Sequence, residues 1–241
     1  MIMKKLILTL AATAVVTAAV AQDREARLPV QRPERGSIST EIQFNPFDQG
    51  GHNFSLDGIK ARFFFTDRDA LRAKIGFGLT TDKFKTEFGD ASYDKRRMGN
   101  VSVALGYERH FPVAQRIDFY VGGQFEFAKH FAKTKGRVGD QEFEIDNAAV
   151  EVSDLTDPFA ALSEDNRGSS SFSFAVLGGM DIYIYRGLYL GTELGFDFSA
   201  SRFDKVKFSA PGYPERQTGD TARKLDIGFY IEPTIRLGYT F

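Results

Sequence analysis

The chain of 241 residues has no cysteine and no tryptophan. The absence of cysteine excludes disulfide bonds and thiolate metal sites. The 31 basic and 32 acidic residues nearly cancel, to a formal net charge of −1, so the composition gives no sign of nucleic-acid binding. Beyond the N-terminal region no stretch approaches about 18 uninterrupted apolar residues, which excludes a later helical membrane span. The chain is instead rich in Phe (24), Tyr (9) and Gly (23), and this many aromatic residues favours β structure.

The N-terminus has the pattern of a secretory signal peptide. Lys4 and Lys5 form a short positive region, an apolar stretch covers residues 6–18, and residues 19–21 read Ala-Val-Ala, an A-x-A cleavage site. We therefore predict a signal peptide over residues 1–21. The alternative is an uncleaved anchor, but the apolar stretch is short for a span of about 20 residues. Gln22 stands where a lipoprotein would have cysteine, which excludes lipid attachment there.

The mature chain divides into a short tail and one domain. Residues 22–36 contain two prolines among alternating charges and show no periodicity, so we predict a flexible periplasmic tail. From residue 37 to residue 241, stretches of alternating apolar and polar residues recur. Such alternation indicates β-strands, because successive side chains of a strand point to opposite faces.

The last segment shows the alternation most clearly. One parity holds Leu225, Ile227, Phe229, Ile231, Ile235, Leu237, Tyr239 and Phe241, and the other holds charges and glycines. Seven earlier segments repeat the pattern, over residues 38–44, 59–65, 71–79, 101–111, 117–127, 172–185 and 188–198. Phe64 breaks it in the second of these. The sequence thus predicts eight strands.

Short and long connections alternate between these segments. The short ones cover residues 66–69, 112–116 and 186–187, and the long ones cover residues 45–53, 82–97, 132–170 and 204–224. Barrels of the bacterial outer membrane have short periplasmic turns and long outer loops. The pattern therefore predicts an all-β fold, an eight-stranded antiparallel up-and-down transmembrane β-barrel located in the bacterial outer membrane.

Alternation alone does not say which face meets water, since a soluble exported barrel carries its apolar face inward. The polar parity here combines charges of both signs with glycines such as Gly106 and Gly191, which suits a narrow lumen. The apolar parity is rich in Phe and Tyr near strand ends, as in an interfacial aromatic girdle. These features and the predicted export favour the membrane barrel over the soluble one.

The C-terminal sequence supports a family resemblance. Residues 235–241 resemble the C-terminal assembly signal of outer-membrane proteins, with Leu237, Tyr239 and the terminal Phe241 at alternating positions. Residues 37–241 resemble the OmpA-like and OmpX-like family of small outer-membrane β-barrels. The resemblance implies a Gram-negative host and insertion by the barrel-assembly machinery.

Charged residues on the polar parity are expected to point into the lumen. They are Glu41, Lys60, Arg62, Arg72, Lys74, Glu108, Asp118, Glu126, Asp181, Glu193, Asp197, Asp226, Glu232 and Arg236. The interior of an eight-stranded barrel is only wide enough to be filled by side chains. Buried charges must pair or meet trapped water. We predict a structural ion-pair network that plugs the barrel, with a gated ion path as the alternative.

Three classes of function remain open. The leading hypothesis is a non-enzymatic protein with surface-exposed loops, which acts in envelope integrity, surface attachment or host contact. The second is a narrow porin-like channel for ions or small solutes. The third is a lipid-modifying enzyme, in which His130, Ser171 or Ser173, and Glu126 would form a triad, although no sequence motif supports it. We expect no cofactor and no metal ion.

The third long connection and the second carry the charges that bear on partners. Between Asp140 and Asp165 all charged residues are acidic, without the spacing of a calcium loop. This run is interpreted as a solvated surface, or else as a contact surface for an extracellular macromolecule. The bases of the second connection are placed to meet lipopolysaccharide phosphates: Lys83, Lys85, Lys95, Arg96 and Arg97. Outer-membrane lipids and lipopolysaccharide are therefore expected partners.

Overall fold

The computed structural model describes residues 29–44, 56–86, 92–152, 155–218 and 223–241. Within its strands, the side chains of residues 43–44, 56–57, 84–86, 92–93 and 229–235 lie outside the described part. The predicted signal peptide, residues 22–28 of the predicted tail and the first long connection also lie outside it. No helix among the described residues is long and apolar enough to cross a membrane.

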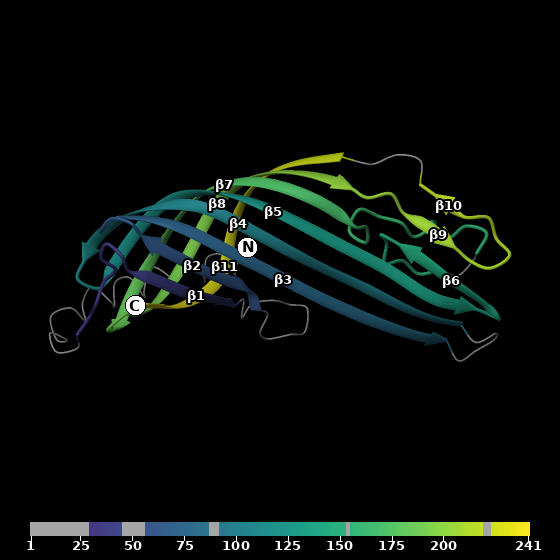
Figure 1. Cartoon of the computed structure of the whole chain (residues 1–241), viewed down its shortest axis with the longest axis horizontal. Coiled ribbons are helices and arrows are strands. Elements are labelled where there is room, and N and C mark those ends of the chain that lie inside the picture. Colours follow the sequence, from purple (N-terminus) through teal and green to yellow (C-terminus); the bar gives the residue numbers. More distant parts are fainter. Residues whose placement is uncertain (1–28, 45–55, 87–91, 153–154, 219–222) are drawn as a thin grey trace, which may run out of the picture.

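Among the described residues, eight strands close into a ring in which each strand is antiparallel to its neighbours (Figure 1). In ring order they are β1 (Ile38–Phe44), β2 (Leu56–Phe64), β3 (Asp69–Thr86), β4 (Ser92–Ala114), β5 (Ile117–Val138), β7 (Ser169–Tyr185), β8 (Leu188–Phe203) and β11 (Arg223–Thr240). Pairing between β1 and β11, with Thr40 opposite Tyr239, closes the ring. The predicted eight-stranded up-and-down barrel is confirmed.

Three further strands lie where the sequence predicts long connections. β6 (Gln141–Asp146), β9 (Lys207–Ser209) and β10 (Arg216–Gln217) form a side sheet in the order β5-β6-β9-β10. This sheet, the end of β5 that pairs with β6, and residues 147–152, 155–168 and 204–217 are called the lobe below. The predicted long connections over residues 132–170 and 204–224 thus contain strands, because backbone pairing continues here beyond the apolar–polar pattern of the membrane wall.

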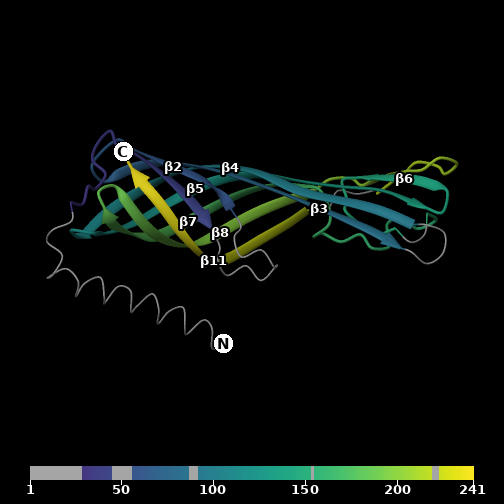
Figure 2. The ribbon, with the colours of Figure 1, turned by 90° about the horizontal axis from the view of Figure 1, so that it is seen from below.

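The barrel wall has very unequal height. β3, β4 and β5 have 18, 23 and 22 residues, whereas β1 and β2 have 7 and 9. Figures 1 and 2 show the three long strands leaving the barrel on one side and carrying the lobe at their far end. We call this end the loop end and the opposite end, with the short connections, the turn end.

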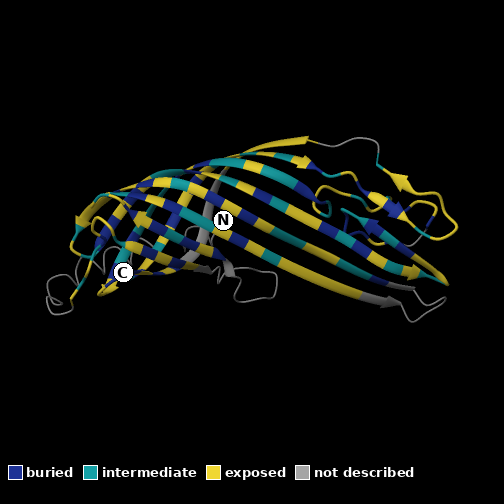
Figure 3. Cartoon of the chain, in the orientation of Figure 1, coloured by how far each residue is buried: buried dark blue, intermediate teal, exposed yellow. Residues whose placement is uncertain are grey.

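The strands present apolar side chains outward and polar side chains inward. Leu71, Ile75 and Phe125 are more than half exposed, whereas Arg62 and Arg236, on the other parity, are buried. Figure 3 shows this alternation of buried and exposed residues along each strand. An apolar band of this kind is the lipid-facing surface of a transmembrane barrel. A soluble barrel is excluded, because it would hold these side chains inside.

The described end of the predicted tail lies along the turn end. Arg186 and Val30 form a bridge, and the Arg35 amide donates a hydrogen bond of 3.0 Å to Asp67 Oδ1. Arg32 Nε donates to the carbonyl of Gln115 at 2.9 Å. Residues 30–36 are thus held against the turns.

Candidate functional site

Eight charged side chains meet in the barrel lumen near the turn end. The acids are Glu41, Glu108, Asp181 and Glu193, and the bases are Lys60, Arg62, Arg72 and Arg236. They come from seven strands, each from an inward position of the alternation. All eight are at most 3% exposed. Four acids and four bases balance in charge, which a low-dielectric interior requires.

Arg62 lies at the centre of this ionic cluster. Its guanidinium contacts Glu108 at 2.7 Å, Asp181 at 2.6 Å and Glu41 at 3.0 Å. Lys60 reaches Glu41 and Glu193, each at 3.3 Å. Two bases of one strand are therefore shared among acids of four other strands.

Arg72 and Arg236 complete the cluster across the lumen. Arg72 forms a two-pronged contact with Glu193, at 3.0 and 3.1 Å, and reaches Glu108 at 2.7 Å. Arg236 reaches Glu41 at 3.1 Å and Asp181 at 3.3 Å. Each base thus contacts at least two acids, so the charges alternate and link opposite walls. Such a network fills the lumen rather than lining a path through it.

Aromatic rings close the cluster on the turn side. The Tyr120 hydroxyl donates a hydrogen bond of 2.6 Å to Glu193, and the Arg62 guanidinium lies 4.7 Å from the Tyr120 ring centroid. His110 stacks on Tyr120 and bridges Glu108 at 3.2 Å and Asp118 at 2.9 Å. The lumen below the ion pairs is therefore occupied by side chains as well.

Glycines on the inner face make room for these large groups. A Cβ at Gly191 would overlap Asp181 Oδ1 and lie 2.8 Å from Arg236 Nη2. A Cβ at Gly238 would overlap the Tyr189 ring. The glycine-rich polar parity thus corresponds to a crowded lumen.

The other predicted lumen residues lie outside the cluster. Asp118 is linked to it through His110. Lys74, Glu126 and Asp197 are inward but only partly buried. Asp226 is half exposed and lies 3.5 Å from Lys224. The described pairing of its strand with β1 runs from Thr240 to Ile235. The side chain of Glu232 lies outside the described part.

Sequence reasoning missed part of the cluster's surroundings. Phe64, which breaks the alternation, is fully buried and lies with its ring 5.0 Å from that of His110. Tyr120 and Tyr189 were on the inner parity, but nothing in the sequence distinguished them from wall residues. Their position on that parity was the only available signal.

The strand register argues against the triad of the enzyme hypothesis. Glu126 and His130 are four residues apart on β5, and a strand rises about 3.3 Å per residue, so their Cα atoms are about 13 Å apart. Ser173 lies opposite Glu126, and Ser169 lies opposite His130. A base and its orienting acid need hydrogen-bond contact, and this backbone keeps the two apart.

The lobe has an apolar core of its own. Its fully or nearly buried members are Phe143, Ile145, Ala148, Val150, Val152, Leu155, Val206 and Phe208. The Thr134 hydroxyl ties β5 to this core, because it donates to the carbonyl of Ala148 at 3.1 Å and accepts from the amide of Val150 at 3.0 Å. The acidic run is therefore a folded unit and not a wholly solvated loop.

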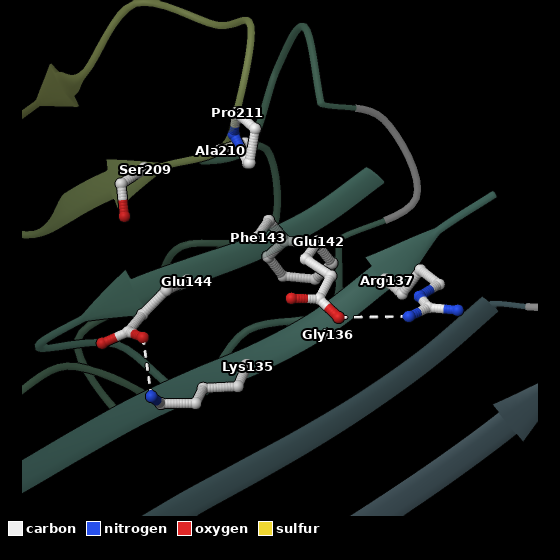
Figure 4. A pocket seen from close by; sticks show the side chains of 9 residues that line it. All are labelled: Lys135, Gly136, Arg137, Glu142, Phe143, Glu144, Ser209, Ala210 and Pro211. Carbon is white, nitrogen blue, oxygen red and sulfur yellow. Dashed lines mark hydrogen bonds and ion pairs between the residues drawn. The ribbon is translucent and has the colours of Figure 1, made fainter. Parts of the chain in front are cut away.

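The acids of β6 face the bases of β5 across the surface of the lobe. Glu144 contacts Lys133 and, at 2.7 Å, Lys135, while Glu142 contacts Arg137 at 3.1 Å. Hydrogen bonds from Lys133 and Lys135 lower the pKa of Glu144. These pairs border an open groove of about 720 Å³, which Ser209, Ala210 and Pro211 close on the far side (Figure 4). No three His, Asp or Glu side chains within the described ranges converge as metal ligands would.

Comparison with known proteins adds fold neighbours only. No family model and no curated protein matches the sequence. Among solved structures, a major outer membrane protein of Thermus thermophilus matches with a TM-score of 0.38 and 11% identity over 85% of this chain and 99% of that one. Ail, the attachment invasion locus protein of Yersinia pestis, matches with a TM-score of 0.28 and 14% identity, over 85% and 95% of the two chains. CarO of Acinetobacter baumannii matches with a TM-score of 0.30 and 12% identity, over 86% and 97%.

Proposed function

We propose that this protein is a non-enzymatic resident of the bacterial outer membrane, in which a sealed barrel anchors the lobe at the cell surface. The ionic cluster carries the proposal. Its side chains reach across the lumen and pair with opposite walls, so the barrel serves as a rigid platform rather than a pore. The role is surface attachment or envelope integrity, as expected for barrels whose loops carry function.

The proposed location rests on the apolar band and on the predicted signal peptide. The band is exposed on the barrel wall, and only lipid makes such a surface favourable. The short connections then face the periplasm and the lobe faces the exterior. Tyr239 lies near the end of β11 and Phe241 directly follows the strand, both at the turn end, where the predicted assembly signal would meet the insertion machinery.

The lobe is the part proposed to contact another macromolecule. Its own apolar core holds it in one shape beyond the membrane. Its surface offers paired charges and a groove, which is a typical composition for a polar contact surface. A solvated loop would need neither a core nor side strands.

Conductance and heat-modifiability test this proposal together. The purified protein should change its migration on a detergent gel after boiling, because a closed barrel resists detergent until heated. In a planar bilayer it should give no steady conductance. Defined conductance steps would support the channel alternative and overturn the sealed platform. The variant Arg62→Ala with Tyr120→Ala removes two of the three largest fully buried side chains and serves as the positive control for leak.

Protease treatment of intact cells tests the orientation. Trypsin should cut within the lobe at Lys205, which is exposed in the connection between β8 and β9, while the barrel remains protected. A lipid A mass spectrum that changes on overproduction of the protein would contradict the non-enzymatic assignment. Protection of the lobe in intact cells, with cleavage only after lysis, would reverse the proposed orientation.

A further inference from the structure

Two arginines border the apolar band on β8 and β11. Arg202 and Arg223 lie directly opposite each other on the outward face. The next outward residue on β11 is Leu225, which is 73% exposed, and Ile227 follows it. Both arginines are themselves exposed. The two guanidinium groups therefore lie at the level where the lipid-facing surface ends on the loop side.

This arrangement of like charges is unfavourable without an anion. Residues directly opposite on antiparallel strands have Cβ atoms about 4.5–5.5 Å apart, and like charges at that spacing destabilise the sheet. Within the described ranges, no carboxylate lies at ion-pair distance from Arg202 or Arg223. By contrast, Lys129 in the same row is paired with Asp204 at 2.6 Å. Of the three bases in this row, two thus lack a counter-charge.

A hollow lies between the two arginines. Its volume is about 360 Å³, and Ala200, Ser201, Lys224 and Leu225 complete its lining. On the outward face the small side chain of Ala200, opposite Leu225, leaves the guanidinium groups accessible from outside. The hollow adjoins the apolar band through Leu225. It therefore offers paired positive charges above a surface suited to acyl chains.

A second group of bases repeats the arrangement on the long wall. Lys83 lies directly opposite Lys95, and Arg97 is the next outward residue of β4. Partial desolvation and the charges of Arg97 and Lys83 lower the pKa of Lys95. No described carboxylate pairs with these three, whereas Glu144 pairs with Lys135, the neighbour of Lys95 on β5. Arg96, which the sequence placed with them, instead contacts Asp94 at 2.7 Å.

We propose that Arg202 and Arg223, together with the group Lys83, Lys95 and Arg97, bind the phosphate groups of lipopolysaccharide in the outer leaflet, with its acyl chains on the apolar band. The inference rests on the proposed location in the outer membrane. A guanidinium presents paired donors that match phosphate oxygens, and the two-phosphate headgroup supplies the missing counter-charge. The bases would then fix the barrel's depth and its lipid neighbours.

Titration with fluorescent lipopolysaccharide tests the inference on the full chain in a non-ionic detergent. Arg202→Ala with Arg223→Ala should weaken binding about tenfold or more, since two charge-assisted contacts are lost. The matched control is Arg35→Ala with Arg68→Ala, which removes the same charge at the turn end and should leave affinity unchanged. Enzymatically dephosphorylated lipopolysaccharide should bind the wild type at least as weakly as the intact lipid binds the double variant, which keeps the group Lys83, Lys95 and Arg97.

Three outcomes would overturn the inference. They are equal affinity of both double variants, equal affinity for dephosphorylated lipid, and displacement of the lipid by millimolar inorganic phosphate, which would indicate a site for the free ion. Each variant is first checked for heat-modifiability and for absence of conductance. If the wild type passes both checks but does not bind lipopolysaccharide, the proposal of a sealed platform stands and only the proposed lipid site is rejected. Conductance steps would instead remove the platform.

Discussion

The two halves of β5 pack in opposite senses. In the half nearer the turns, Phe125 faces outward and is 55% exposed, while Gln124 is buried in the polar lumen. In the half that enters the lobe, Lys135 faces outward, and Thr134 on the other face is buried against the lobe's apolar core. One strand thus has a polar interior in its first half and an apolar interior in its second.

The exchange of the polar and apolar faces of β5 is caused by a change in the surrounding solvent and not by a change in strand pairing. The antiparallel pairing of β4 with β5 continues without interruption from Phe111 opposite Phe119 to Tyr93 opposite Arg137. Where lipid surrounds the wall, apolar groups are stable outside and charges must pair inside. Where water surrounds it, burial of apolar groups stabilises the fold in the usual way. The reversal, between Phe131 and Lys133, therefore marks the outer limit of the lipid-facing surface.

Removing a central base of the ionic cluster should have the largest effect on the stability of the barrel relative to the lobe. Arg62→Ala leaves Glu41, Glu108 and Asp181 without their shared partner, and an uncompensated buried charge costs about 3–5 kcal/mol. We expect a markedly lower urea midpoint for the heat-modifiable band. Arg68→Ala, in a turn, is the control and should leave the midpoint unchanged. Equal midpoints would mean that the cluster is not the core of the barrel.

A cavity in the lobe should act only on the lobe. Ile145 is fully buried, and Ile145→Ala should destabilise the lobe by about 2–5 kcal/mol through the lost apolar contact and the cavity left behind. Trypsin should then cleave the lobe faster, while the urea midpoint of the barrel stays the same. The control is Glu142→Ala at an exposed site. A parallel fall in barrel stability would show that the two cores fold as one unit.

A methyl group added inside the lumen should have a smaller effect. Gly191→Ala places a Cβ against Asp181 and Arg236, so the ion pair must shift. Overpacking of this kind costs about 1–3 kcal/mol. Gly228→Ala is the matched control, because a Cβ there meets nothing within 4 Å. Identical urea midpoints for the two variants would indicate that the lumen has spare room, and would weaken the sealed barrel.

The sequence predicted the strands of the barrel where they face lipid, because lipid requires apolar and polar residues to alternate. It did not predict the strands that face water, because water does not require this alternation. β1 begins and ends where the alternation does. β4, by contrast, begins at Ser92, well before the predicted start at residue 101. The sequence did not show this part of the strand, because consecutive residues such as Lys95 and Arg96 are polar on both faces and resemble a loop. The sequence also missed β6, because its two buried apolar residues, Phe143 and Ile145, are too few to show a period.

Parity also predicted which charges point inward but not which of them meet. Glu193 and Asp226 share the inner parity of their strands, yet only Glu193 reaches the cluster. The height of a residue in the barrel depends on strand register and on the length of the neighbouring strand. Neither can be read from a single segment. The sequence showed Phe64 as an exception to the apolar–polar alternation, but its contact with His110 also depends on the strand register.

The smallest predicted effect concerns acid pH at the junction between lobe and wall. The pKa of Glu144 is lowered by hydrogen bonds from Lys133 and Lys135, so its contribution to stability is present above the unfolded value of 4.5 and is lost as pH falls through the lower folded pKa. Hydrogen-exchange protection of β6, corrected for intrinsic rates, should therefore decrease as the pH is lowered from 4.5. The substitution Glu144→Gln should remove part of this pH dependence. The change should be slight, because Glu144 is one-third exposed and solvent screens the pair. A large loss of protection would mean that these surface pairs, and not the apolar core around Ile145, hold β6 to the wall.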